Sequence, residues 1–523
     1  MKSIRVLAAA CVLGALAGCS SAPAPVTPTQ SASDLTPGNR TAVRQGGTLR
    51  WAVDEVPASL DVYQADATAD TALIAHALLP SLYRLDDHAR PVPDPDYLVG
   101  AELTDRTVTY RLNPKAVWSD GTPVTAADFT AQWTALRDTH PGYQAIASIA
   151  QGVDQHQVKV VFRQPYAEWK SLFSPLNPAA GLPLSAGPLL LKSLDAKGGK
   201  AALVRNPRWW GDAPKVDELD FLATPDRLDA LSQSRVDVAA LEGTVDHPPT
   251  TNSADALDSA TRALQRARAL PGITLHRAAA PAFTQLTLNG ARGQLAEPAV
   301  RRAVAACVDR AKIAQAALGP LGLPAAPLGN HLLMADQQGY HDNSASLAAT
   351  AKSMHLELSL LYPDGSATAR RTADALVAQL APYGITVHPQ AASPDGFVRD
   401  HLAAGDWDLA LFSWPATAFP ATDERPLYAK PQVGPDGKLV LGLNYGGSGT
   451  DEIDQLFAKA EAEADPVQQT ALLRQADERI WQLGHSVPLY QRPELVAVRT
   501  GVAGAGAYGF GWPRYQDLGF LRQ

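Results

Sequence analysis

Apolar and polar residues alternate within three short stretches of the first third of the chain. The alternation occupies parts of residues 48–53, 107–112 and 157–163. Successive side chains of a β-strand point to opposite faces, so this pattern predicts strands that bury one face. The sequence therefore predicts three early strands in these stretches.

A helical period appears between the second and third of these strands. Phe129, Trp133 and Leu136 stand at i, i+4 and i+7, the spacing of one helix face. Thr125 can cap the start of this helix, and Asp128 three residues later completes a capping-box pattern. We therefore expect an amphipathic helix that begins immediately after Thr125.

The second half of the chain continues to alternate helices with strands. Pro298 suits the first position of a helix, whose apolar face would include Val304 and Cys307. Cys307 is thus predicted to be a small buried hydrophobe rather than a reactive thiol. Further helices are predicted near 368–383, 450–464 and 466–483, and strands near 284–288, 356–361, 408–413 and 495–499. The whole pattern predicts a mixed α/β protein.

The N-terminus has the pattern of a secretory signal. Lys2 and Arg5 precede the apolar stretch 6–17, which is too short for a membrane helix of about 20 residues. Its ending, Leu16-Ala17-Gly18-Cys19, resembles the bacterial lipobox, in which cleavage precedes a Cys that receives lipid on its sulfur. Residues 1–18 are therefore predicted to be a lipoprotein signal peptide, with lipid attached to Cys19. The alternative is an ordinary signal peptide in which Cys19 is incidental.

Residues 19–45 are predicted to form a disordered tether. The segment is rich in Pro, Ser, Thr and Ala and holds few large apolar side chains. Such a composition buries too little apolar surface to offset the entropy of ordering the chain. As a coil it would reach on the order of 30 Å. That reach would keep a folded body close to a membrane without contact.

Composition narrows the class of protein. Hydrophobic residues make up 46% of the chain and charged residues 19%, which is typical of a globular protein. The net charge of −8 and the lack of basic blocks argue against a nucleic-acid partner. Cys307 would be the only cysteine left after cleavage and lipidation, so no intramolecular disulfide is expected.

Motifs for catalysis, metals and cofactors are not found in the expected context. The histidines lack zinc-site spacing, and Gly446-Gly447-Ser448-Gly449-Thr450 lacks the last glycine of a hydrolase elbow. Gly504, Gly506 and Gly509 have the spacing of a dinucleotide loop, but 510–513 cannot open the helix that this loop requires. The sequence therefore predicts no enzyme, no metal site and no cofactor.

Tryptophans near predicted strand ends are the most distinctive feature. Trp209 and Trp210 follow Asn206-Pro207, and we interpret them as packing residues. Trp414 leaves the predicted strand 408–413 and is followed by Pro415, Phe419 and Pro420. Proline-rich aromatic segments at strand ends are typical of clefts, so Trp414 is predicted to line a pocket.

Several segments, taken in order, resemble the family 5 extracellular solute-binding proteins, which include dipeptide, oligopeptide and nickel binders. The most specific is RLNPKAVWSDGTPVTAADFTAQWTAL at 111–136. The resemblance extends from about residue 46 to about residue 500. The other matching segments are GGTL (46–49) with SLD (59–61), GPLLL (187–191), LVRNPRWWG (203–211), LTLNG (286–290), EPAVRRAVAACVDRAKI (297–313), GDWDLALFSW (405–414) and VPLYQRPELVAV (487–498).

The resemblance implies an α/β fold of the two-lobed periplasmic-binding-protein type, with an extra domain inserted in the first lobe. The first lobe would be discontinuous, the inserted domain would cover 81–187, and the second lobe 288–489. Hinge closure around a ligand would be the working motion. The first lobe would comprise 46–80, 188–287 and 490–523.

The resemblance also implies where a ligand would bind. In peptide binders of this family a G-W-x-A-D pattern supplies a buried Asp for the ligand's α-ammonium, and the peptide lies extended in the cleft. Here the pattern reads Ser413-Trp414-Pro415-Ala416-Thr417, so Thr417 replaces the acid. Either another acid substitutes, with Asp66, Asp70 and Asp423 as candidates, or the ligand carries no free amine. Further ligand-binding positions would be Asn289, Asn444 and Tyr490.

The function that follows is that of a substrate-binding lipoprotein of an ABC importer, with an oligopeptide or peptide-like solute as ligand. Its partners would be the ABC permease and ATPase subunits and, through the lipid, the cell membrane. We expect a monomer. The alternative is the same fold in a non-transport role, such as envelope assembly or signalling.

Overall fold

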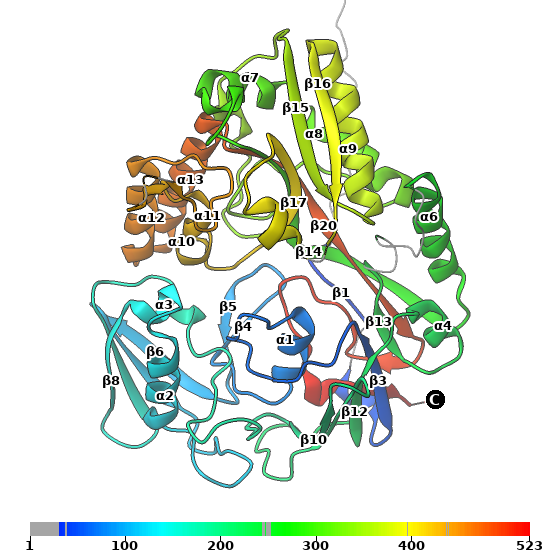
Figure 1. The fold of residues 1–523 in the computed structure, drawn as a ribbon. Coiled ribbons are helices and arrows are strands. Elements are labelled where there is room, and N and C mark those ends of the chain that lie inside the picture. The colour runs from blue at the N-terminus through cyan, green and yellow to red at the C-terminus, as the bar shows by residue number, and fades with distance from the viewer. Residues whose placement is uncertain are drawn as a thin grey trace, which may run out of the picture.

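The computed structural model describes residues 31–36, 39–242, 246, 253–394, 396–435, 437 and 439–522 (Figure 1). The predicted signal peptide, Cys19 and residues 20–30 of the predicted tether lie outside the described residues. The described chain contains one large mixed sheet, a smaller antiparallel sheet and helices that cover both. It is the mixed α/β protein that the periodicity predicts.

The large sheet has ten strands and extends through both lobes of the molecule. The sheet contains both parallel and antiparallel pairs, and strands from both ends of the chain lie near its centre. In spatial order the strands are β10 (Leu189–Asp195), β11 (Lys200–Arg205), β12 (Glu218–Ala223), β3 (Thr48–Val53), β13 (Val238–Ala240), β20 (Ser486–Arg499), β14 (Ile273–Leu288), β17 (Leu409–Pro415), β15 (Leu356–Pro363) and β16 (Ile385–Ala392).

Two long strands, β14 and β20, join the two halves of this sheet. They pair antiparallel from Ile273 opposite Arg499 to Thr287 opposite Ser486, with bulges near residues 279–285. β13 joins β20 on the first-lobe side, and β17 joins β14 on the second-lobe side. Both strands are longer than predicted. Residues 283–288 are all buried, because both faces of the sheet are covered there and a doubly covered strand does not alternate.

The inserted domain is built on a separate antiparallel sheet in the order β6-β7-β9-β8. The predicted helix is α2 (Ala126–Leu136), and its capping box forms: the Asp128 carboxylate accepts from the Thr125 backbone N–H at 2.9 Å. Phe129 is fully buried against this sheet's aromatic core. The strands and the second helix are β6 (Leu98–Thr104), β7 (Thr107–Leu112), β9 (Gln157–Phe162), β8 (Ile146–Gln151) and α3 (Pro141–Gln144).

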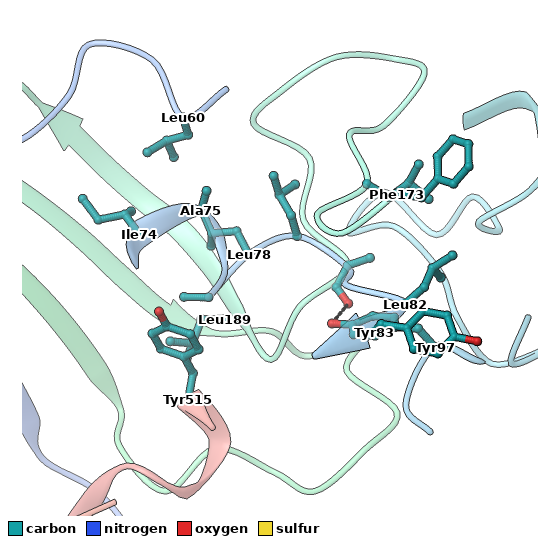
Figure 2. Close-up of a cluster of buried hydrophobic side chains, with 14 of the residues drawn as sticks. Leu60, Ile74, Ala75, Leu78, Leu82, Tyr83, Tyr97, Phe173, Leu189 and Tyr515 are labelled. Atoms are coloured by element: carbon teal, nitrogen blue, oxygen red, sulfur yellow. Dashed lines mark hydrogen bonds between the residues drawn. The ribbon is translucent and has the colours of Figure 1, made fainter. Parts of the chain in front are cut away.

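The inserted domain and the first lobe share one hydrophobic core. Its buried members come from residues 49–278 and 496–518. Figure 2 shows Tyr83, Tyr97 and Phe173 of the inserted domain in the same cluster as Leu189 and Tyr515 of the first lobe. Trp209 and Trp210 pack on Tyr97, with ring centroids 5.9 and 5.6 Å away, which confirms their packing role. These two parts therefore behave as one packed body.

Helices cover the second lobe, and those predicted from sequence are confirmed. α7 begins at Pro298, and Cys307 directly after it is buried. α12 and α13 pack together around a third core that lies wholly within residues 332–480. The second-lobe helices are α7 (Pro298–Ala306), α8 (Arg310–Leu318), α9 (Ala367–Leu380), α10 (Pro420–Asp423), α11 (Arg425–Tyr428), α12 (Asp451–Ala462) and α13 (Pro466–Leu483).

The remaining elements lie mainly in the first lobe and at its edges. Its helices are α1 (Ala69–Ala75), α4 (Arg227–Ser232) and α6 (Ser253–Ala269). The short paired strands are β1 (Asp34–Leu35) with β22 (Gly506–Ala507), β2 (Val43–Arg44) with β23 (Gly519–Leu521), β21 (Val502–Ala503) with β23, β4 (Tyr83–Leu85) with β5 (Pro91–Pro93), and β18 (Gln432–Val433) with β19 (Leu439–Val440).

The structure differs from the prediction of a disordered tether that extends to residue 45. β1 and β2 pair with strands from the last twenty or so residues of the chain. The Asp34 carboxylate also accepts from the Arg277 backbone N–H at 2.9 Å and meets His276 at 3.0 Å. The partners are more than 200 residues away in sequence, so composition alone could not indicate that this segment is held.

Candidate functional site

A cleft of about 860 Å³ lies between the inserted domain and the helices of the second lobe. Its size is within the range of about 300–1,000 Å³ that is usual for ligand pockets. The inserted-domain wall comprises residues 88–91, Leu103 and 167–170, and the second-lobe wall Leu333, residues 337–339, 418–420, Ala464 and the first two turns of α13.

The cleft exposes somewhat more apolar than polar surface and carries few charges. Its polar groups include the amides of Gln337, Gln338 and Gln469, and its cations are Arg90 and Lys170. Its one carboxylate belongs to Glu168, among the residues that the structure describes. Apolar walls with a few separated polar groups are typical of sites that enclose a small solute.

The segment that leaves β17 leads directly into this cleft. Trp414 is half-buried, stacks on Tyr445 with a centroid distance of 5.9 Å and an angle of 4°, and meets Phe412 edge-on at 5.3 Å. Ala418, Phe419 and Pro420, a few residues further along, line the cleft itself. The structure thus places the predicted pocket segment 413–417 beside the cleft. That Trp414 contacts ligand stays a prediction.

A water-sized cavity of about 10 Å³ lies behind Trp414. The side-chain oxygen of Gln285 and the hydroxyl of Tyr428 both line it and have no hydrogen-bond partner among the described residues. Burial raises the pKa of Tyr428, so its hydroxyl is neutral. A cavity of this size with two polar atoms suits one bound water.

Thr417 is held by three hydrogen bonds at the edge of the cleft. Its hydroxyl donates to the Asp423 carboxylate at 2.5 Å and accepts from the Phe419 N–H at 2.9 Å. Its carbonyl accepts from Gln337 Nε2 at 2.9 Å. Thr417 holds the position of the acid in the family pattern, and the Asp423 carboxylate, from the last residue of α10, lies directly beside it. Removal of solvent raises the pKa of Asp423, and the Thr417 hydroxyl lowers it.

The two other acids considered as substitutes lie in the first lobe. The Asp70 carboxylate accepts from the backbone N–H groups of Asp54 and Glu55 at 2.8 and 3.0 Å, so it fixes the local chain. Asp66 is exposed in the loop before α1. Neither Asp66 nor Asp70 contacts Thr417 in the structure, whereas Asp423 does. Asp423 is therefore the best candidate to replace the missing acid.

Ser413 and Pro415 point to the opposite face of β17 from Trp414, as strand alternation requires. The Ser413 hydroxyl lies 2.9 Å from the Thr284 hydroxyl and accepts from Arg492 at 3.2 Å. Pro415 is exposed at the end of the strand. These two residues shape the exit of β17, whereas Trp414 faces the helices that border the cleft.

Asn289, Asn444 and Tyr490 are not brought to the cleft. The Asn289 amide donates to two carbonyls at 3.1 and 2.9 Å, and the Asn444 amide to two at 2.7 and 2.9 Å. Tyr490 is 2% exposed, and its hydroxyl lies 3.0 Å from that of Thr372. All three side chains satisfy buried backbone or side-chain groups, which is a structural use of polar residues.

A contact across the cleft involves residues that the sequence did not single out. Glu168 of the inserted domain accepts hydrogen bonds from the Ala421 and Thr422 N–H groups of α10, at 2.9 and 2.8 Å. The Tyr166 hydroxyl meets the Thr422 hydroxyl at 3.1 Å, and the Ala167 N–H donates to the Glu461 carbonyl at 2.7 Å. We call residues 166–168 and their partners the interlobe contact.

Glu168 is buried in this contact, and its environment changes its acidity. Burial raises the pKa of Glu168 to about 8, while the bonds from α10 lower it by less. The two donors to Glu168 are backbone N–H groups, which are present whatever side chains α10 carries. The side-chain pattern of α10 therefore could not predict this contact. Only a Glu within an aromatic segment, Tyr166 to Trp169, marks the place in the sequence.

The described residues contain no group of three or more His, Cys, Asp or Glu side chains placed to hold a metal ion. Within the same residues, no helix is both long and apolar enough to cross a membrane.

Comparison with known proteins identifies the family. The model of the bacterial extracellular solute-binding proteins, family 5, middle region, matches residues 102–432. The chain belongs to this family. The match covers most of the inserted domain, the long strand β14 and most of the second lobe. It confirms the resemblance seen in the sequence blocks.

Relatives and structures of this family 5 chain agree with that assignment. The oligopeptide-binding protein OppA of Mycobacterium bovis is 33% identical over 544 aligned residues, which cover 94% of this chain and 88% of that protein. The periplasmic EDTA-binding protein EppA has a TM-score of 0.79 at 23% identity and covers 94% and 98% of the two chains. The oligopeptide-binding protein AppA of Bacillus subtilis, solved with a nonapeptide, has a TM-score of 0.64 at 16% identity, with 92% and 100% covered.

The structural likenesses show the fold. This family 5 protein has the two-lobed periplasmic-binding architecture, with the inserted domain packed on the first lobe. The site that its geometry provides is a cleft between packed bodies, bordered by an acid beside the β17 exit.

Proposed function

We propose that this family 5 solute-binding protein captures an oligopeptide or peptide-like solute in the interlobe cleft and delivers it to an ABC permease. The observation that carries the proposal is the cleft of about 860 Å³, whose lining residues 418–420 lie in the chain between Thr417 and its hydrogen-bond partner Asp423. Its apolar walls and spaced amides fit an extended chain of varied side chains.

The comparisons support a peptide more than another solute. A relative that shares 33% identity over 94% of this chain is named an oligopeptide-binding protein. A structural neighbour was solved with a bound nonapeptide, and another, from Helicobacter pylori, with the peptide STSA. A non-transport role of the same fold has no comparable support. The protein would act as a monomeric binder with permease and ATPase subunits as partners, and not as an enzyme.

We further propose that a lipid on Cys19 holds the protein at the outer side of the cell membrane. The support is the sequence Leu16-Ala17-Gly18-Cys19 after a short apolar stretch. Relatives described as lipoproteins match 75% of the chain at 24% identity. A membrane-held binder keeps captured solute near its permease.

The ligand can be tested by native mass spectrometry of the purified protein. We expect a population with added mass, and we expect that mass to be released on unfolding and to fragment as peptides. Adding a pentapeptide should raise the melting temperature by mass action, since it binds the folded state alone. Release of only non-peptide solutes, with no pentapeptide effect, would contradict peptide capture.

A further inference from the structure

One cation of the cleft has no acid partner among the residues that the structure describes. Lys170 lies in the short turn Trp169–Ser171 of the inserted domain and lines the 860 Å³ cleft. It also lines an adjoining pocket of about 140 Å³ between the inserted domain and the first lobe, as Phe419 does. Lys170 and Phe419 therefore mark the junction of the two cavities.

Aromatic rings hold the Lys170 ammonium in place. It lies 5.6 Å from the Trp169 ring centroid and 5.8 Å from that of Tyr83. A cation over aromatic faces is attracted without losing its charge or its hydrogen-bond donors. The Lys170 ammonium is thus positioned, yet its donors have no carboxylate partner among the described residues.

Most of the charged groups that line the two cavities already have a charged or backbone partner, and Asp96 is the exception. Arg90 pairs with Asp86 at 2.7 Å, and Glu168 is used by the N–H groups of α10. In the adjoining pocket, Asp94 pairs with Arg84 at 2.9 Å. Asp96 accepts weakly from Gln516 at 3.5 Å, and Arg514 pairs with Asp517 at 2.9 Å.

Within the described part of the chain, Lys170 is thus a positive charge without an ion-pair partner at the cavity junction, and the net charge of the chain is −8. A cation that faces a partly enclosed cleft attracts a negative group more strongly than a cation in open water, because less water screens the charges. We propose that Lys170 binds a carboxylate of the ligand at this junction and so selects solutes with an anionic end. This proposal rests on the proposed function and specifies the ligand that the cleft accepts.

Two sources could supply the carboxylate: the C-terminus of a peptide or an acidic side chain. The test therefore uses three matched pentapeptides of neutral residues. One has a free C-terminus, one a C-terminal amide, and one an amide together with a terminal Glu side chain. Dissociation constants are measured by calorimetry for the wild type, Lys170→Gln, Lys170→Arg and the control Lys115→Gln. Lys115 is exposed, lies in the same domain and forms no recorded ion pair among the described residues.

We expect the wild type to bind at least one carboxylate-bearing peptide about tenfold or more tightly than the neutral amide, as charged hydrogen bonds permit. Lys170→Gln should remove that preference and leave binding of the neutral amide unchanged. Lys170→Arg should keep much of it, and Lys115→Gln all of it. The preference should shrink as salt is raised. The peptide that shows the effect identifies the source of the carboxylate.

Other results overturn the assignment in distinguishable ways. If Lys170→Gln weakens all three peptides equally or none of them, Lys170 supports the structure or is idle, while peptide capture stands. If the wild type binds no peptide, citrate is used as a small carboxylate probe in a thermal-shift assay. Stabilisation by citrate that Lys170→Gln abolishes would retain the carboxylate site and refute peptide capture. No stabilisation would refute both.

Discussion

The Thr417 hydroxyl donates a hydrogen bond to the Asp423 carboxylate just after β17. Asp423 can therefore supply the carboxylate that the family pattern has at position 417. Asp423→Asn should weaken binding of a free-amine pentapeptide relative to its N-acetylated form. Asp423 is exposed, and a hydrogen bond to a charged group contributes about 1.5–3 kcal/mol, so the preference should fall about tenfold. Calorimetry with the two peptides measures it.

Asp66→Asn is the matched control for this prediction. It removes the same charge from an exposed loop in the first lobe, so it should leave the free-amine preference intact. If Asp66→Asn abolishes the preference and Asp423→Asn does not, the ammonium site lies across the cleft. If the wild type has no preference to lose, the ligand is not read through its amine.

At the scale of elements, the short helix α10 connects the interlobe contact to the ligand site. Its first N–H groups bond to Glu168, and its last residue is Asp423. Movement of the inserted domain away from the second lobe would release α10 at one end. The position of Asp423 at the other end would then be less defined. We therefore expect closure and ligand binding to be coupled through this helix.

The acidity of Glu168 makes this coupling depend on pH. With the lobes in contact its pKa is about 8, whereas an exposed glutamate has a value near 4.3. Contact therefore binds the proton more tightly, so protonation favours it. The contribution is complete below about pH 4.3 and is lost as pH rises through about 8. Small-angle scattering should show a larger radius of gyration at pH 9 than at pH 5.

Two glutamine variants separate this effect from general changes with pH. Glu168→Gln is uncharged at both pH values, so its radius should not depend on pH. Glu494 also has a pKa raised by burial to about 8, and its carboxylate accepts from Tyr508 and Gly509 at 3.2 and 2.7 Å. Glu494→Gln should alter the pH dependence of melting and keep the wild-type change in radius. An equal wild-type radius at pH 5 and 9 would contradict the coupling.

For the whole molecule, the folded body and the proposed lipid anchor are separate features. The cores draw on residues from 43 onward, and Cys19 lies outside the described residues. Cys19→Ser should therefore leave the melting temperature unchanged and release the protein from the membrane. Cell fractionation with a melting curve measures both. Membrane association that persists in the variant would show that Cys19 is not the anchor, and the ordinary signal peptide would then be the better interpretation.

Local patterns in the sequence determined most elements of this protein. The Thr125–Asp128 capping box and the proline at 298 fix helix starts through neighbours three residues or fewer away. Strand alternation located β3, β7 and β9 for the same reason. The block 111–136 indicated the family, because its order of residues resembles that of the family and can be read without knowing the fold. The family in turn implied the two-lobed fold.

The tertiary structure alone decided which side chains meet. Composition suggested a free tether through residue 45, yet β1 and β2 pair with strands at the opposite end of the chain. Asn289, Asn444 and Tyr490 resembled ligand residues, but buried groups around them take their hydrogen bonds. A local turn brings Asp423 back to Thr417, six residues earlier, whereas Glu168 bonds to α10 across about 250 residues of chain. Such contacts depend on which groups lie close together in the folded chain. A backbone N–H is present in every residue except proline, so the sequence does not show which of them will bind a carboxylate.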